Sequence, residues 1–199
     1  MLTALGIPRQ DIVFVGQAAG ISDGKLVEHL APALSALRAL VGARGPVERI
    51  VMHAGEGGHH DHDATHLIGR MLARDLGIAD ASRQFALYRA GPAGRIRFAD
   101  PDPAHGEIEA LAIPYASRGP YLLLLRHYWS QLRVMMQLGP RLLSAYLRDG
   151  LEKLQRLPPP HVLLSPPADE PLYQRWNLYS YGRFEQHAAP FISAGKLAD

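Results

Sequence analysis

Cysteine is absent from this 199-residue chain. Disulfide bonds and thiolate metal sites are therefore excluded, and histidine and carboxylate groups would have to hold any transition metal. The chain also lacks a basic block, because its 21 Lys and Arg residues are scattered and nearly balanced by 19 Asp and Glu residues, for a formal net charge of +2. We therefore expect no nucleic-acid partner.

Long apolar runs are missing as well. The most apolar short run, YLLLL at Tyr121 to Leu125, is followed at once by Arg126 and His127. A bilayer span needs about 20 apolar residues, so we expect no transmembrane segment. The opening MLTALGIPRQ has neither the charged n-region nor the apolar stretch of a signal peptide. Together with the lack of cysteine, this favours a cytoplasmic location.

The residues that are present are typical of a globular α/β protein. Apolar residues make up 47% of the chain and charged residues 20%, which is enough for a real core. Two short apolar runs, DIVFVG (11–16) and VERIVMHA (47–54), indicate strands. Apolar residues at helical spacing predict helices over 25–44 and 61–76. Strand, helix, strand, helix favours a parallel sheet flanked by helices.

The second half of the chain is less regular. SRQFALYRA (82–90) and GRIRFA (94–99) indicate strands around a Gly-Pro turn. The ranges 121–138 and 141–157 are typical of two amphipathic helices, and the proline-rich range 158–171 of an extended segment. A last helix is expected near YGRFEQHAAPF. We therefore divide the chain into a core over 1–157 and a C-terminal part over 158–199 that packs on it.

Five of the ten histidines lie within fourteen residues, in HAGEGGHHDHDATH (53–66). This segment follows the carboxyl end of the second predicted strand, where ligands bind in parallel α/β sheets. If a helix begins near His59, then His59, His62, Asp63 and His66 share one face. Imidazole and carboxylate groups on one face suit Zn²⁺. A purely structural use remains open, with His66 paired to a carboxylate of the same helix.

The segment GGHHDHDATH resembles the second motif of the PIG-L/LmbE-like N-acetylglucosaminyl deacetylases. That motif is commonly His-Pro-Asp-His followed by a small residue, and here His60 stands in place of the proline. Other segments match in the same order along the chain. FVGQAAGISDGKL resembles the family's strand-loop-helix entry "FLG…DG.L", YWSQL (128–132) its "Y.SQ" helix, and LYQRW (172–176) with RFEQHAAPF its C-terminal "LYERW…FE.F".

The resemblance implies a Rossmann-like core and a zinc-dependent hydrolase. The expected reaction removes an N-acetyl group from a glucosamine-containing sugar or glycoconjugate. By the family pattern, His62 is a ligand of Zn²⁺ or another divalent metal. His59 lies beside the scissile amide, where it polarises the carbonyl or protonates the leaving amine. Asp61 orients His59 as a hydrogen-bond partner.

The family's first motif, AHPDDE, does not occur in this chain. In the family it follows the first strand and supplies two more metal ligands, one His and one Asp, and a second Asp that acts as general base. The chain matches the family downstream of that motif. We therefore expect the N-terminal strand-helix-strand of the fold to be missing and His62 alone to bind metal weakly. Strand edges left without neighbours would favour a homo-oligomer.

Three explanations remain open. The chain is a fragment of a longer enzyme, which we favour because the His-x-Asp-His motif is intact. Alternatively, it is a catalytically inactive binding or assembly module of the same fold. In the third explanation other side chains complete the metal site, and the candidates are His53, Glu56, His59 and His66. A self-contained site that stores several metal ions is a further alternative.

Overall fold

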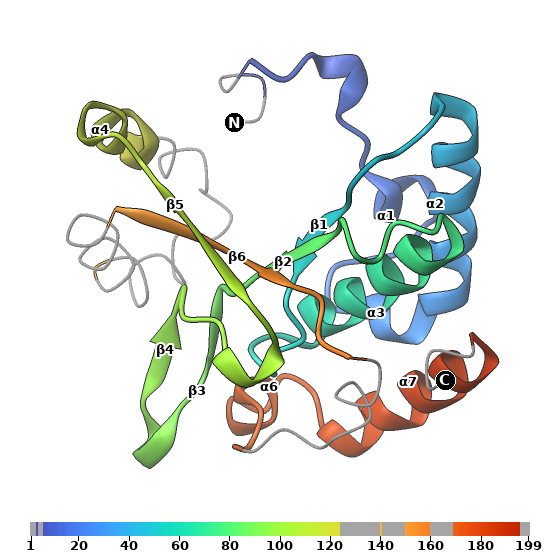
Figure 1. The fold of residues 1–199 in the computed structure, drawn as a ribbon. Coiled ribbons are helices and arrows are strands. Elements are labelled where there is room, and N and C mark those ends of the chain that lie inside the picture. Colours follow the sequence, from blue (N-terminus) through green and yellow to red (C-terminus); the bar gives the residue numbers. More distant parts are fainter. Residues whose placement is uncertain (1–2, 4–5, 124–139, 141–149, 160–168, 196–199) are drawn as a thin grey trace. The chain divides into compact units, whose positions relative to one another are not determined.

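The structure is a computed structural model, and it describes residues 3, 6–123, 140, 150–159 and 169–195 (Figure 1). The described residues form a mixed α/β protein with a four-stranded sheet and a separate two-stranded sheet. The chain divides into two compact units. The first comprises Met1–Phe14 and Ala110–Lys153, and the second comprises Val15–Glu109 and Leu154–Asp199.

The first unit holds the 3-10 helix η2 (Arg9–Asp11), most of strand β5 (Ile108–Ala112), helix α4 (Tyr115–Leu123) and the start of strand β6 (Leu151–Arg156). The second unit holds the remaining elements. Its helices are α1 (Val15–Ala18), η3 (Leu26–His29), α2 (Leu30–Arg44), α3 (His60–Asp75), η4 (Pro92–Gly94), η5 (Pro103–His105), α6 (Leu172–Arg175) and α7 (Tyr181–Ala194). Its complete strands are β1 (Val51–His53), β2 (Arg83–Phe85), β3 (Tyr88–Ala90) and β4 (Ile96–Phe98).

A strand-helix-strand unit lies at the centre of the second unit. Strands β1 and β2 are parallel, with His53 opposite Phe85, and helix α3 connects them. Strand order in the larger sheet is β1-β2-β6-β5. Strand β6 runs antiparallel to β2, so the sheet is mixed and not parallel throughout as expected. The α/β class is confirmed.

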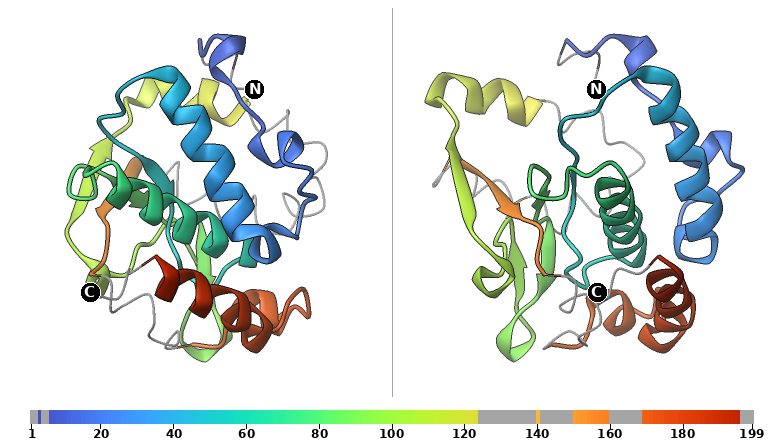
Figure 2. Two further views of the ribbon diagram at one scale, coloured as in Figure 1. Left: turned by 90° about the vertical axis from the view of Figure 1, so that its right-hand side faces the viewer. Right: turned by 45° about the vertical axis from the view of Figure 1, so that its right-hand side comes forward.

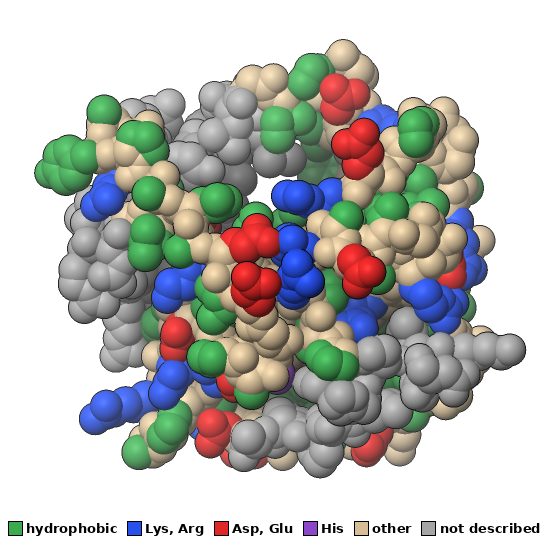
Figure 3. Space-filling model, viewed as in Figure 1, with side chains coloured by type: hydrophobic (Ala, Val, Ile, Leu, Met, Phe, Trp, Pro, Cys, Tyr) green, Lys and Arg blue, Asp and Glu red, His purple; other side chains and the backbone are tan. Residues whose placement is uncertain are grey.

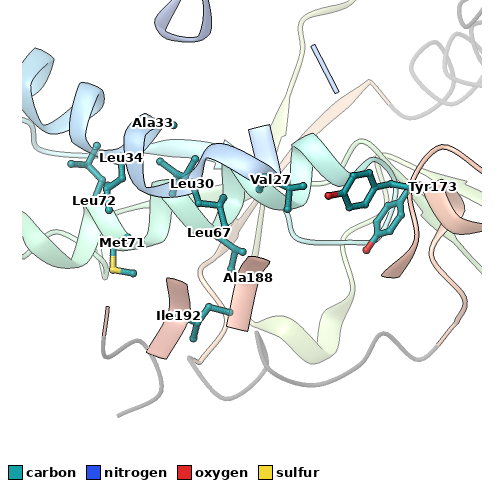
Figure 4. Close-up of a cluster of buried hydrophobic side chains, with 13 residues drawn as sticks. Val27, Leu30, Ala33, Leu34, Leu67, Met71, Leu72, Tyr173, Ala188 and Ile192 are labelled. Atoms are coloured by element: carbon teal, nitrogen blue, oxygen red, sulfur yellow. The ribbon is translucent and has the colours of Figure 1, made fainter. Parts of the chain in front are cut away.

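The core of the second unit lies where helices α2, α3 and α7 meet (Figure 2). Figure 4 shows side chains from these helices pointing toward one another, among them Leu34, Leu67, Met71 and Ile192. All four are at most 4% exposed. Burial of one such side chain contributes roughly 1.5–3 kcal/mol. Among the described residues, helix α3 contributes five of the thirteen buried side chains of this core, and it packs against β1.

The helix predicted over 61–76 is confirmed as α3. It begins at His60, after His59 as N-cap, and ends at Asp75. Gly77 follows with φ +70°, a left-handed conformation that glycine adopts without strain. The helix predicted over 25–44 is confirmed as η3 and α2, and the terminal helix as α7.

The strand predicted over DIVFVG is wrong. Residues 12–14 have no regular structure, and Val15–Ala18 forms the short helix α1. Val13 and Phe14 are exposed, at 40% and 69%. A strand is stable only when a neighbour satisfies its backbone hydrogen bonds, and no described strand pairs with this segment.

The helix predicted over 141–157 is wrong at its end. Residues 151–156, LEKLQR, form strand β6. Every residue in that stretch is a good helix former, but its pairing with β2 overrides this weak local preference. Residues 141–149 lie outside the described part, as do 124–139 of the other predicted helix and 160–168 of the extended segment. The division of the chain at residue 157 stays a prediction.

The predicted strands of 82–99 are confirmed with a different grouping. SRQFALYRA contains two strands, β2 and β3, and β3 pairs with β4 as an antiparallel hairpin around Gly91–Gly94. On the face shown in Figure 3, acidic and basic side chains are interspersed. Arg83 and Glu109 form an ion pair, with Nη2 and Oε1 2.6 Å apart.

One helical stretch, Leu26–Arg44, is long and apolar enough by length and composition to cross a membrane. It lies near the N-terminus, and 22% of its most apolar window is buried. Four of its residues, Val27, Leu30, Ala33 and Leu34, belong to the core that it shares with α3. The predicted lack of a transmembrane segment stays a prediction.

Candidate functional site

The histidine cluster lies where β1 ends and α3 begins. His53 is the last residue of β1, and His59 is the N-cap of α3, so His59, Asp61 and His62 are fixed to the first turn of a well-packed helix. This position at the carboxyl end of β1 is the one that the sequence predicts. Asp61 and Asp63 also place negative charge in the first helical turn, where the helix dipole favours it.

The Asp61 carboxylate ties the helix start to the loop before η3. Its Oδ2 accepts a hydrogen bond from the Gly24 N–H at 2.6 Å, and its Oδ1 accepts one from the Leu26 N–H at 3.1 Å. Among the described residues, no hydrogen bond joins the Asp61 carboxylate to the His59 ring. The expected orienting role of Asp61 toward His59 therefore stays a prediction, and the observed role is to hold the loop at 24–26.

The His59 ring caps its own helix. Its Nδ1 accepts a hydrogen bond from the Asp61 backbone N–H at 3.2 Å. An accepting Nδ1 carries no proton, so the proton of the neutral ring resides on Nε2. The helix start thus leaves His59 with an N–H donor, which is the form that polarises a carbonyl oxygen.

His60 takes the complementary tautomer. Its Nε2 lies 3.1 Å from the Gly24 carbonyl oxygen, which can only accept, so Nε2 donates and Nδ1 keeps the lone pair. Its ring lies between His59 and Tyr179, with centroid distances of 4.4 and 4.5 Å. Nδ1 is buried and has no hydrogen-bond partner. Sequence reasoning treated His60 only as a substitute for proline and missed this unpaired lone pair.

His62 stacks on His53. The two rings are parallel within 3°, with centroids 4.3 Å apart. The Tyr88 ring meets His62 in an edge-to-face arrangement with ring centroids 5.8 Å apart, and the His59 and His62 centroids are 5.3 Å apart. His62 is partly exposed. The predicted ligand therefore lies beside two other imidazoles and is not enclosed in an apolar interior.

His66 and Asp63 lie on the buried side of α3. The His66 Nδ1 donates to the His53 carbonyl oxygen at 2.9 Å. The Asp63 carboxylate accepts hydrogen bonds from the backbone N–H groups of Glu56 and Gly57 and thereby fixes the loop that leads from β1 into the helix. The four residues predicted to share a helical face therefore divide into two groups, His59 with His62 and Asp63 with His66.

The imidazoles of the site are held neutral. Burial lowers the pKa of His53, and burial together with His60 lowers the pKa of His59. Burial and the neighbouring histidines lower the pKa of His62 to about 3. Neutral imidazole is the form that binds a metal ion. At neutral pH no proton has to leave these rings before a metal binds.

The donor set fits a divalent transition metal in part. His59, His60 and Asp61 each offer a ligand atom, and these atoms lie within 4.8 Å of one another. Ligand atoms on tetrahedral Zn²⁺ are about 3.4 Å apart, since its bonds are about 2.1 Å long, so side-chain rotations would have to bring the donors closer. Both Asp61 oxygens already accept backbone hydrogen bonds, and His60 Nε2 lies against the Gly24 carbonyl oxygen, whereas His60 Nδ1 has no partner.

An apolar cavity of about 530 Å³ adjoins the cluster. Most of its wall is aliphatic and comes from α2, α3 and β1, including Leu37, Ile68 and Val51. Its polar wall includes His53, Asp61 and Asp23. Val51 is 50% exposed because β1 is the last strand of the sheet on this side. The histidine cluster is thus open toward a space next to an unpaired strand edge.

Comparisons with protein-family models, with curated proteins and with solved structures find no match for this chain.

Proposed function

We propose that this chain carries part of the active site of a zinc-dependent N-deacetylase that acts on an N-acetylated amino sugar or glycoconjugate. One observation carries the proposal. His59, Asp61 and His62, the residues of the His-x-Asp-His motif, project from the first turn of α3 beside the carboxyl end of β1. The Rossmann-like character of the fold belongs to the same proposal, and the parallel β1-α3-β2 unit supports it.

In this proposal His62 is the metal ligand and His59 the substrate-facing acid. His59 Nε2 carries a proton because Nδ1 accepts from the helix backbone, so it donates to the amide carbonyl oxygen of the acetyl group. Asp61 acts on His59 indirectly, because it fixes the helix start that sets the His59 tautomer. When bound, the metal polarises the carbonyl and acidifies a water molecule. Water and the amide yield acetate and the free amine.

His62 alone is an incomplete set of ligands for this reaction. Catalytic zinc generally has three protein ligands and an open position for water, and the AHPDDE motif that would add two of them is absent from the sequence. The Asp61 and Asp63 carboxylates are not free to act as base, since both accept backbone hydrogen bonds. We therefore expect the chain to bind Zn²⁺ weakly and to hydrolyse little.

The test compares the chain as it stands with the same chain preceded by a strand-forming segment that ends in AHPDDE. Release of acetate from N-acetylglucosamine is measured with and without Zn²⁺. We expect the added segment to raise hydrolysis by about 10²-fold or more, the scale of a restored general base. His59→Gln and His62→Gln in the extended chain should abolish this gain, whereas His187→Gln on α7 should retain it. Full turnover by the unextended chain would contradict the proposal.

A second candidate function is a non-catalytic binding or assembly module. The Asp61 hydrogen bonds to Gly24 and Leu26 favour it, because they give that carboxylate a structural role without any metal. The two proposed functions predict different results for the extended chain. Zn²⁺ binding without hydrolysis there would favour the module.

A further inference from the structure

A second cavity, of about 330 Å³, lies in the same unit on the side of Asp63 and His66. None of the three motif residues lines it. Its wall combines carboxylates, a buried histidine and three aromatic rings, including those of Tyr173 and Phe184. A volume of this size suits a small organic ligand. The polar atoms of the wall determine which class of ligand the cavity would bind.

Two of these polar atoms are buried and have no partner. His66 is 1% exposed, and its Nε2 makes no hydrogen bond. Since its Nδ1 donates to the His53 carbonyl, Nε2 carries the lone pair and can only accept. The Glu56 Oε1 accepts from the backbone N–H groups of Leu87 and Tyr88, whereas Oε2 is unpaired. A buried acceptor without a donor destabilises the protein, and a ligand that supplies the donor would remove that cost.

The wall is rich in carboxyl groups, and burial raises the pKa of two of them, Glu56 and Asp63, to about 7. Glu56, Asp63, Asp102 and Asp169 line the cavity together with one cation, Arg89. Arg89 is already engaged, because its Nε donates to the Asp100 carbonyl oxygen and its Nη1 lies 3.6 Å from Asp102. An anion would therefore meet acceptors and carboxylates, while a cation with N–H groups would satisfy both unpaired atoms. The aromatic rings also attract cations.

We propose that this cavity binds the primary ammonium group of a small organic molecule, with N–H donors directed to His66 Nε2 and Glu56 Oε2. The aromatic part of the wall would contact the apolar body of the ligand. This site uses none of the three motif residues and does not depend on the proposed deacetylase activity. Its ligand needs a positive charge and at least two N–H groups.

The test uses three probes of similar size, which are benzylamine, benzyl alcohol and benzyltrimethylammonium. Binding to the full chain is measured by titration calorimetry and by NMR shifts of backbone amides, at neutral pH and without metal. We expect benzylamine to bind at least about tenfold more tightly than either control, with shifts centred on Gly55, Gly57 and Ala90. If benzyl alcohol binds as tightly as benzylamine, the ligand does not need a positive charge and the proposal is wrong. If benzyltrimethylammonium binds as tightly, the ligand does not need N–H donors and the proposal is equally wrong.

Two variants locate the site. Glu56→Gln keeps an oxygen for the Leu87 and Tyr88 N–H groups and should weaken benzylamine binding at least about tenfold. The matched control Glu48→Gln removes one carboxylate at an exposed position outside the cavity and should leave binding unchanged. If Glu56→Gln does not fold, His66→Asn serves as the second variant, with the same expected loss. Binding that survives in the folded variant, or no detectable binding of benzylamine to the chain, would overturn the proposal.

Discussion

The histidine side chains of the segment 53–66 make different contacts, although they are all of one residue type. His59 caps a helix, His60 bonds a loop carbonyl, His62 stacks on His53, and His66 supports the end of β1. Spacing along the chain predicts which of them share a helical face. It does not predict tautomers, because these depend on backbone groups such as the Gly24 carbonyl, which is remote in sequence.

His66 should make stability depend on pH. Burial lowers its pKa to about 3 in the folded protein, against an ordinary value of 6.5. The unfolded chain therefore binds more protons between these values, so the stability due to His66 is complete above pH 6.5 and is lost as the pH falls toward 3. His66→Asn should cost about 1–3 kcal/mol at neutral pH.

This cost should shrink in acid, by no more than about 1.4 kcal/mol per pH unit. Urea unfolding of the wild type and of His66→Asn at about pH 7 and pH 5 measures the change. A cost that stays constant, or grows as the pH falls, would show that His66 is not held neutral.

Asp61 should stabilise the fold even without metal. Asp61→Asn turns one oxygen that accepts a backbone hydrogen bond from Gly24 or Leu26 into a donor, so an N–H group loses its partner. We expect a loss of about 1–3 kcal/mol in the free energy of unfolding. Asp23→Asn, at an exposed neighbouring position, is the control and should change it by less than about 0.5 kcal/mol. Equal effects of the two substitutions would exclude the structural role of Asp61.

At the scale of elements, the periodic helices were predictable, whereas the strands were predictable only in part. Helices α2, α3 and α7 follow from apolar spacing and end signals in the sequence. Strand β6 does not, because LEKLQR favours a helix and becomes a strand only through partners far along the chain. Gln155 is 1% exposed, and its Oε1 accepts from Gln84 Nε2 at 2.8 Å. A buried pair of this kind fixes strand β6, but it produces no hydrophobic periodicity within the sequence of that strand.

The contact between α3 and β1 should be sensitive to a single methyl group. A Cβ on Gly69 would lie 2.7 Å from Met52 Sδ and 3.3 Å from its Cβ, whereas a Cβ on Gly42 in α2 meets nothing within 4 Å. Gly42→Ala should therefore stabilise by about 0.5–1 kcal/mol through helix propensity. Gly69→Ala should destabilise by about 1–3 kcal/mol because the core is overpacked. Thermal unfolding of both variants measures this, and a stabilising Gly69→Ala would contradict the close packing.

At the scale of the whole molecule, the position of the histidine cluster was predictable, whereas the lack of a strand at DIVFVG was not. The rule that ligands bind beyond the carboxyl ends of parallel strands located the cluster at β1. The segment DIVFVG was assigned to a strand from its apolar residues alone, although pairing also requires a neighbour. The same lack of a neighbour leaves one edge of β1 unpaired among the described strands.

This free edge should promote self-association. Val51 is 50% exposed on the last strand of the sheet, and an unpaired apolar edge is a template for another chain. We expect sedimentation analysis to detect oligomers that grow with protein concentration, and Val51→Lys to suppress them. Leu178→Lys, 52% exposed and between α6 and α7, adds the same charge and should have no effect. Equal effects of both substitutions would exclude the strand edge as the contact.

Titration calorimetry of Zn²⁺ into the purified chain tests the central claim most directly. The account predicts one weak site that loses at least about tenfold in affinity in His62→Gln and keeps its affinity in His187→Gln. Zn²⁺ binding that is indifferent to His62, or uptake of several ions per chain, would contradict a single metal centre at the start of α3.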